Sequence, residues 1–261
     1  MVIPKTFVMA ILSLASSLPT QAEEAVTAST AAKHLFILSG QSNMGPAGLK
    51  DAFTESVEKN YGKENVVVAR YFRNSQPIRQ WVRDYKFPAD EKLTEVEAEK
   101  RTKSLERYPN GGFYDGQMLT TLKKTMEKFQ PTSVTLIWMQ GEEDANGTSE
   151  TYADAFEKLI GQLRTDLAFE NVTFVIGRIN DFYLKRPEGK EIREIQVKLA
   201  ESNPRGAWID TDDLNTGINP WGTHETDGGH FALDNYPVLG RRFAEAAVKL
   251  LGGTMVNPVA R

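Results

Sequence analysis

The chain alternates short runs of apolar, mostly β-branched residues with longer segments whose apolar residues recur at helical spacing. The short runs predict buried strands, which cover residues 34–39, 65–72, 133–139, 172–179 and 206–211. The periodic segments predict helices, which cover residues 115–129, 150–168, 190–201 and 234–251. A highly charged stretch, residues 90–103, predicts a solvated helix or an insertion.

Strands that alternate with helices indicate a parallel sheet with helices on both faces. Because the crossovers are right-handed, the pattern predicts an α/β fold, a three-layer α/β/α sandwich around a mostly parallel five-stranded sheet. Ligands of such folds bind outside the carboxyl ends of the strands. Polar segments follow the predicted strands at that edge, and they read G-Q-S-N-M, R-N-S-Q-P-I-R-Q-W, Q-G-E-E-D, N-D-F-Y and D-D-L-N. A binding or catalytic site is therefore predicted there.

The N-terminal segment has the pattern of a secretory signal. Lys5 precedes the apolar stretch F-V-M-A-I-L-S-L-A, and the following P-T-Q-A predicts cleavage after Ala22. The apolar stretch is too short to span a bilayer comfortably, so we expect a secreted or periplasmic protein without a membrane span. The predicted organisation is a signal peptide over 1–22, a flexible lead-in over 23–33, one domain over 34–252 and a C-terminal tail over 253–261.

Composition and charge narrow the possible functions. Lys and Arg number 31 against 35 Asp and Glu, giving a formal net charge of −4. This balance does not favour nucleic acid as a partner. The absence of cysteine excludes disulfides and thiol chemistry. The chain has only 3 histidines, so a zinc site would need two of them together with carboxylates. We therefore expect no metal and no other cofactor.

Ser42, after the first predicted strand, is a candidate nucleophile. A serine hydroxyl needs a base to take its proton. His34 begins the same strand, at the opposite end of the sheet, and is expected to be a strand-edge residue. His230 follows Asp227 by three positions, with two glycines between them that permit a tight turn. Such a carboxylate can orient the imidazole toward a serine. His224 could be a surface loop residue or a substrate contact.

A tetrahedral intermediate also needs hydrogen-bond donors for its oxyanion. Ser42 can offer its backbone N–H, and Gln140, directly after the third predicted strand, can offer its side-chain amide. A third donor could come from the segment Y-P-N-G-G-F-Y-D-G, through the N–H of Gly111 or Gly112.

Three blocks of the sequence carry a family resemblance. G-Q-S-N-M, W-M-Q-G-E-E-D-A and T-D-G-G-H-F resemble the blocks of SGNH hydrolases. They are more narrowly similar to the sialate O-acetylesterase and acetylxylan esterase-like branch, carbohydrate esterase family six and its relatives. The resemblance extends from about residue 34 to 250, and its three blocks occur in the expected order. It implies a flavodoxin-like SGNH hydrolase fold and a secreted serine esterase that removes O-acetyl groups from a carbohydrate.

The resemblance also implies roles for individual residues. Ser42 would form the acetyl-enzyme, His230 would act as base and then acid, and Asp227 would orient His230. Gln140 would stand where other SGNH enzymes use asparagine as an oxyanion donor. Glu142 would organise the site by hydrogen bonds, although it could also be a solvent-facing loop carboxylate.

The glycine segment departs from the family pattern. The family often has a G-P-x segment where this chain has N-G-G, so the third donor stays open between Gly111 and Gly112, with Asn110 as a substitute.

Other residues have two interpretations each. Gln41 and Asn43 could brace the nucleophile turn or touch the substrate, or they could be ordinary turn formers. Trp81 could line a sugar-binding cleft or be a buried anchor. Arg79 could meet an anionic substrate group or pair with a surface acid.

Two other functions remain open from the sequence. One is a carbohydrate-binding protein of the same fold that has lost catalysis. The other is an esterase that acts on short non-sugar acyl esters, since the sequence shows no apolar lid for long acyl chains.

Overall fold

The computed structural model describes residues 1–2, 31–88, 93–225 and 228–255. Nearly all of the predicted signal peptide and lead-in, the end of the predicted tail, and Asp227 lie outside the described residues. The domain discussed below begins after Thr30.

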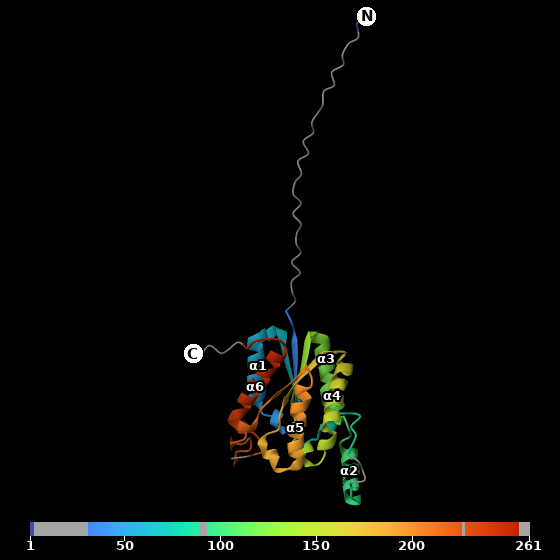
Figure 1. The fold of residues 1–261 in the computed structure, drawn as a ribbon, viewed down its shortest axis with the longest axis vertical. Helices are drawn as coiled ribbons and strands as arrows, with labels where there is room; N and C mark the ends of the chain where they lie inside the picture. The colour runs from blue at the N-terminus through green and yellow to red at the C-terminus, as the bar shows by residue number, and fades with distance from the viewer. Residues whose placement is uncertain (3–30, 89–92, 226–227, 256–261) are drawn as a thin grey trace. The chain divides into compact units, whose positions relative to one another are not determined.

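A sheet of five parallel strands forms the centre of this domain (Figure 1). The strands are β1 (His34–Gly40), β2 (Val66–Phe72), β3 (Ser133–Met139), β4 (Val172–Gly177) and β5 (Gly206–Ile209). Their order is β2-β1-β3-β4-β5, and every neighbouring pair is parallel. Each strand lies where an apolar run predicts one, because strands covered on both faces need apolar side chains on both faces.

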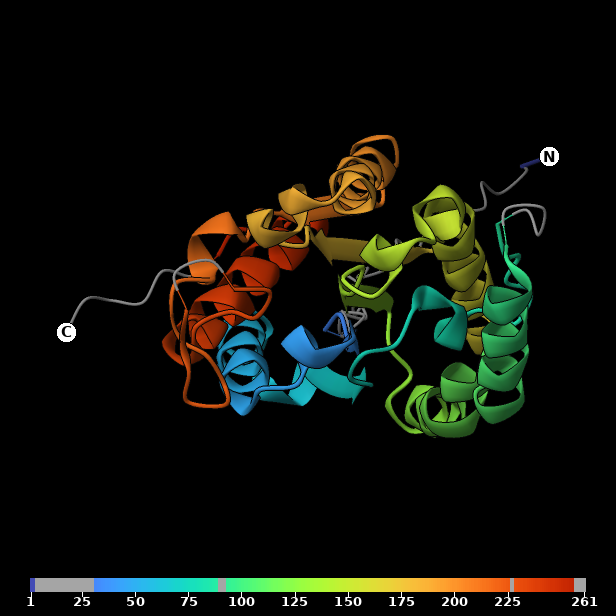
Figure 2. The same cartoon turned by 90° about the horizontal axis from the view of Figure 1, so that it is seen from below.

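Helices cover both faces of the sheet, which confirms the predicted three-layer α/β/α fold (Figure 2). Side by side on one face lie α1 (Ala47–Tyr61) and α6 (Tyr236–Leu250). The other face is covered by α3 (Leu119–Phe129), α4 (Tyr152–Leu167) and α5 (Pro187–Glu201). Helix α2 (Glu95–Arg107) begins with a capping box at Thr94 and buries none of its residues. It is the solvated helix that the charged stretch predicts, although its bounds are shifted toward the C-terminus.

Helix α1 and the strands β6 and β7 were not predicted from the sequence. Helix α1 buries only Leu49, Ala52, Phe53 and Val57, which have helical spacing, but its apolar face is narrow and most of its other residues are polar. Strands β6 (Gly217–Ile218) and β7 (His224–Glu225) form a short antiparallel hairpin. Two-residue strands are too short to show an alternating pattern. The predicted helix over 115–129 is also divided, since a π-helical turn (Tyr114–Met118) precedes α3.

The sheet order reverses direction at the boundary between β1 and β3, where folds of this kind bind ligands. The ends of these strands approach closely, because Gly40 is paired with Met139 and the Gln41 N–H donates to the Met139 carbonyl at 2.9 Å. Gly40 has a φ of +145°, and a Cβ at this position would lie 1.9 Å from the Met139 carbonyl oxygen. Glycine is therefore required where the chain turns from β1 toward Ser42.

His34 lies at the other end of β1, as expected. Its Nδ1 is 2.7 Å from the Ser133 hydroxyl, and its ring stacks on Tyr61 with 3.9 Å between the ring centroids. Within the described part of the chain, none of the helices combines the length and the apolar character needed to cross a membrane.

Candidate active site

Ser42 and His230 meet at the carboxyl end of β1. Ser42 begins a short 3-10 turn (Ser42–Met44) directly after the strand. His230 lies in the loop that precedes α6, 188 positions later in the sequence. The Ser42 Oγ lies 2.9 Å from the His230 Nε2. This is hydrogen-bond distance, so the imidazole is placed to take the hydroxyl proton.

The environment of His230 favours its neutral form. Burial lowers the pKa of His230 below its ordinary value of 6.5, and the nearby Glu225 carboxylate opposes this effect. A neutral imidazole can accept a proton, so the ring is suited to act as a base at neutral pH. Asp227 lies outside the described residues, and its role as the orienting carboxylate stays a prediction.

Asn43 connects the turn that begins at Ser42 to the loop that carries His230. Its Nδ2 donates to Glu142 Oε1 at 2.9 Å and to the Gly229 carbonyl at 3.1 Å, while its Oδ1 accepts from the Tyr236 hydroxyl at 2.8 Å. Asn43 is next to Ser42, Gly229 is next to His230, and Tyr236 begins α6. Asn43, only 1% exposed, therefore holds together the segments that carry Ser42 and His230.

Gln41 makes a similar connection on the other side of Ser42. Its buried side-chain oxygen accepts from the backbone N–H of Glu143, 3.3 Å away, in the loop that follows β3. Both flanking side chains thus point into the protein. The geometry favours bracing of the turn over contact with a substrate.

Two buried carboxyl groups lie in the loop after β3. Burial raises the pKa of Glu142 to about 7 and that of Asp144 to about 6. Glu142 is therefore a buried partner of Asn43 and not a solvent-facing residue. Asp144 accepts hydrogen bonds from the Ile78 backbone N–H at 2.8 Å and the Thr148 hydroxyl at 2.7 Å. It ties the loop after β2 to the loop after β3.

The candidate oxyanion donors differ in what they already bind. Among the described residues, the Ser42 backbone N–H makes no hydrogen bond. Gln140 is fully buried after β3, and its Nε2 donates to Asp144 Oδ2 at 2.6 Å and to the Gln76 carbonyl at 3.2 Å. The Ser42 N–H is therefore the donor without another acceptor. To donate to an oxyanion, Gln140 would have to release its longer bond, the one to the Gln76 carbonyl.

The backbone N–H groups of Gly111 and Gly112 already donate to carbonyl groups of the protein. The Gly111 N–H donates to the Arg79 carbonyl at 2.8 Å, and the Gly112 N–H donates to the Pro109 carbonyl at 3.0 Å. The Asn110 side-chain amide donates to the Tyr85 carbonyl at 3.3 Å. A donor from this segment would require the segment to change its hydrogen bonds, so the third donor stays a prediction.

Trp81 is not part of a sugar-binding cleft. Its ring is 0% exposed, its Nε1 donates to the Ser39 hydroxyl at 3.0 Å, and it packs edge-on against Trp138. The second interpretation, a buried anchor, is the correct one. Arg79 is also buried, and it donates to the Tyr108 carbonyl and the Ser104 hydroxyl, both at 2.6 Å. Among the described residues its hydrogen-bond partners are thus a carbonyl and a hydroxyl group, and not a surface acid.

Trp221 is a site residue that sequence reasoning missed. It lies in the β6–β7 hairpin, and its ring centroid is 4.3 Å from that of His230, with the two rings nearly perpendicular. The only sequence signal was its position nine residues before His230 in the segment W-G-T-H-E-T-D-G-G-H. The hairpin creates this ring contact, and its two-residue strands are too short to be predicted from the sequence.

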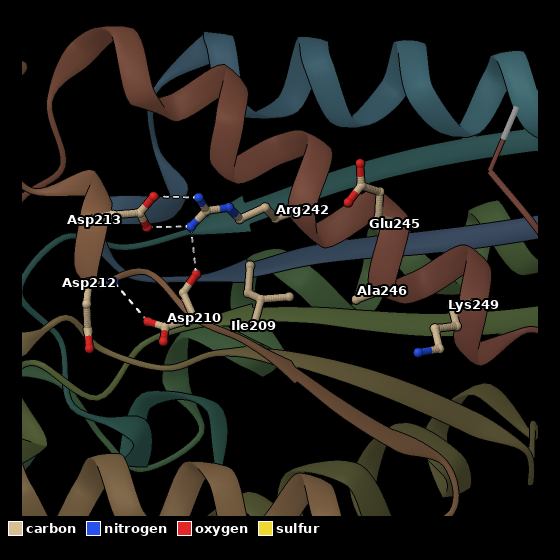
Figure 3. A pocket seen from close by; sticks show the side chains of 8 residues that line it. All are labelled: Ile209, Asp210, Asp212, Asp213, Arg242, Glu245, Ala246 and Lys249. Carbon is tan, nitrogen blue, oxygen red and sulfur yellow. Dashed lines mark hydrogen bonds and ion pairs between the residues drawn. The ribbon is translucent and has the colours of Figure 1, made fainter. Parts of the chain in front are cut away.

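A separate charged pocket lies between the end of β5 and α6 (Figure 3). Arg242 binds both carboxylate oxygens of Asp213 at 2.6 Å and also donates to the Asp210 carbonyl. On the adjacent side, Asp212 pairs with Arg178 and Arg193. Arg242 thus links α6 to the segment that follows β5. In the described ranges, no group of three His, Cys, Asp or Glu side chains could hold a metal ion.

Comparisons with known proteins agree with this architecture. A carbohydrate acetylesterase from Xanthomonas citri has 16% sequence identity and a TM-score of 0.57, covering 85% of this chain and 57% of that protein. A protein from Arabidopsis thaliana has 15% identity and a TM-score of 0.57, covering 84% of this chain and 98% of that protein. The chain thus spans little more than half of the Xanthomonas protein. At these identities the likeness shows the fold, and it confirms the SGNH hydrolase fold.

No curated protein matches the sequence significantly. A family model, described as carbohydrate esterase, sialic acid-specific acetylesterase, matches residues 96–249. The match includes Gln140, Glu142 and His230, and Ser42 precedes it. Because the model covers more than half of the 261 residues, the chain belongs to the carbohydrate esterase family of sialic acid-specific acetylesterases.

Proposed function

We propose that this protein is a secreted serine esterase that removes O-acetyl groups from a carbohydrate through an acetyl-enzyme on Ser42. The observation that carries the proposal is the 2.9 Å distance between Ser42 Oγ and His230 Nε2, in a chain of a carbohydrate esterase family. An inactive binding protein would have no use for a base held against a serine hydroxyl.

The reaction follows from this pair. Ser42 Oγ attacks the acetyl carbonyl carbon while His230 Nε2 takes the hydroxyl proton. The tetrahedral intermediate collapses, its bond to the sugar oxygen breaks, and His230 returns the proton to that oxygen. A water molecule, deprotonated by His230, then attacks the acetyl carbonyl; the bond to Ser42 Oγ breaks, acetate leaves, and His230 returns the proton to Ser42 Oγ. We assign the orientation of His230 to Asp227, as the D-x-x-H spacing suggests.

The oxyanion is assigned first to the Ser42 backbone N–H, which makes no other hydrogen bond among the described residues. Gln140 is the second proposed donor, because its 3.2 Å bond to the Gln76 carbonyl is long enough to exchange for a charged acceptor. Gly111 stays a prediction, since its N–H is donated to Arg79. Losing one such donor typically costs about 10²–10³ in kcat.

The proposal is tested by acetate release from a panel of acetylated glycans, including xylan, pectin and O-acetylated sialic acid. A series of p-nitrophenyl esters from acetate to octanoate distinguishes an acetylesterase from an esterase for other acyl groups. Labelling of Ser42 by a fluorophosphonate, read by mass spectrometry, distinguishes an active serine from a dead site. Absence of labelling together with absence of acetate release would contradict the esterase assignment.

Secretion is proposed from the N-terminal pattern alone. Expression of the full chain in a bacterial host should yield a product whose first residue is Glu23, in the periplasm or medium. Recovery of the uncleaved chain from the cytoplasm would contradict this assignment.

The pH dependence of kcat/KM should report the ionisation of His230. Because the base must be neutral, kcat/KM should rise with pH through the pKa of His230. Burial lowers that pKa, so the midpoint should lie below 6.5. Glu225→Gln should move the midpoint lower still, since it removes the carboxylate that favours the imidazolium. The measurement is a pH profile with a neutral acetylated sugar.

Glu170→Gln is a control for this profile. Glu170 is exposed and lies just before the amino end of β4, whereas His230 lies at the carboxyl end of β1. The substitution should leave the midpoint unchanged. A wild-type midpoint above 6.5, or no response to Glu225→Gln, would mean that His230 is not the titrating base.

Asn43→Ala should lower kcat by about 10–100-fold with little change in KM. The substitution removes the bonds to Glu142, Gly229 and Tyr236, and misplacement by about 1 Å can cost about 10²-fold. Tyr236→Phe removes only one of these bonds and should have a smaller effect on kcat. Steady-state kinetics of both variants check this, and a larger effect on KM than on kcat would identify Asn43 as a substrate contact instead.

A further inference from the structure

Trp221 presents a large apolar surface to solvent beside the catalytic histidine. The residue is 63% exposed, although tryptophan is usually buried for most of its area. The exposure is not the result of a loose terminus, since Trp221 lies within the β6–β7 hairpin. An exposed indole at the edge of a site is a surface that a bound molecule can cover.

The hairpin holds Trp221 in a defined position. The buried Asn219 accepts from the backbone N–H groups of Trp221 and Thr223 through its Oδ1, both at 3.0 Å. Its Nδ2 donates to Glu225 Oε1 at 2.7 Å, and its backbone N–H donates to the Thr223 carbonyl at 2.8 Å. One side chain thus fixes the turn from inside, so little conformational entropy would be lost when a ligand covers Trp221.

The position of Trp221 relative to His230 indicates which part of an ester it would meet. In the proposed reaction His230 Nε2 returns a proton to the leaving oxygen, which must therefore lie within hydrogen-bond reach of that atom. The alcohol part of the substrate consequently extends on the His230 side of Ser42. The acyl oxygen is held on the Ser42 N–H side. With its ring centroid 4.3 Å from the imidazole, Trp221 lies on the side of the alcohol.

We propose that Trp221 is a stacking platform for the pyranose ring whose acetylated hydroxyl is the leaving group. This inference rests on the proposed function, because a sugar alcohol is what a carbohydrate esterase releases. The C–H groups of one pyranose face form an apolar surface that matches an indole ring. Ile218, 46% exposed in β6, extends the apolar surface of the same hairpin. The platform determines specificity for the alcohol and takes no part in bond making.

The test compares two acetates with different alcohols. In Trp221→Ala, kcat/KM for an acetylated xylo-oligosaccharide should fall by about 10–100-fold, mainly through KM, as expected when about 1.4–2.8 kcal/mol of binding is lost. For ethyl acetate, followed by pH-stat, kcat/KM should change less than about threefold, since ethanol is too small to cover an indole. Trp221→Phe should give an intermediate loss on the sugar, and Thr223→Ala, in the same turn, should resemble wild type on both.

Equal losses on both acetates would overturn the proposal, because they would mean that Trp221 only positions His230. No loss on either acetate would overturn it as well. A binding measurement separates its failure from that of the proposed function. In Ser42→Ala protein, unesterified xylo-oligosaccharides should quench tryptophan fluorescence, and this quenching should disappear in Ser42→Ala/Trp221→Phe. If wild type releases acetate from no sugar but the Ser42→Ala protein shows this quenching, the esterase assignment fails and the platform stands. If the Ser42→Ala protein shows no quenching, the platform fails.

Discussion

Ser42→Ala is expected to lower kcat/KM for an acetylated sugar and for p-nitrophenyl acetate by at least about 10⁴-fold, while the Tm stays within about 2 °C of wild type. Loss of the nucleophile leaves only binding and oxyanion stabilisation, and in serine hydrolases these supply a small part of the rate. The fold should survive, because the Ser42 hydroxyl is bound to His230 and is not part of the packed core. Enzyme kinetics and thermal unfolding measured on the same preparation provide the check.

Ser202→Ala is the matched control, since Ser202 is an exposed serine at the end of α5. It should retain wild-type kinetics. The Ser42→Ala protein should also resist fluorophosphonate labelling, which separates loss of the nucleophile from loss of substrate binding. If Ser42→Ala kept more than about a hundredth of the wild-type kcat/KM, hydrolysis would have to proceed without an acetyl-enzyme on this residue.

The second large effect concerns the fold around the same turn. Gly40→Ala should lower the free energy of unfolding by about 4 kcal/mol or more, or prevent accumulation of soluble protein. The new Cβ would lie 1.9 Å from the Met139 carbonyl oxygen and 2.5 Å from its carbon. The φ of +145° is also strained for any residue with a side chain. Since a typical domain is stable by about 5–15 kcal/mol, such a loss is a large share of the total.

Chemical denaturation and thermal unfolding of Gly40→Ala measure this loss, and a fall in Tm of about 8–16 °C is expected for a domain of this size. Gly161→Ala is the control. Gly161 lies inside α4 with no atom within 4 Å of an added Cβ, so this change should stabilise the protein by about 0.5–1 kcal/mol. A Gly40→Ala protein as stable as wild type would mean that β1 and β3 separate at their ends without cost.

Gly40 also explains part of the motif G-Q-S-N-M on physical grounds. The close approach of β1 and β3 admits no side chain at position 40, while Gln41 and Asn43 brace the loops on either side of the serine. Three of the residues around Ser42 are thus explained by packing and hydrogen bonding. Ser42 is the member of the motif whose side chain faces His230.

The sequence by itself determined the α/β class and the places of the five strands, and it predicted that Ser42 and His230 lie at the same end of the sheet. These follow from local patterns, because apolar runs mark buried strands, and parallel strands bring the residues that follow them to one edge. Helix α1 and the β6–β7 hairpin were not predicted, since the apolar face of α1 is narrow and each hairpin strand has only two residues. Only the tertiary structure decided that Trp81 is buried, that Trp221 is exposed beside His230, and that Asn43 joins the turn that begins at Ser42 to the loop that carries His230. Burial and contacts between distant segments depend on how whole elements pack, and no local pattern records that packing.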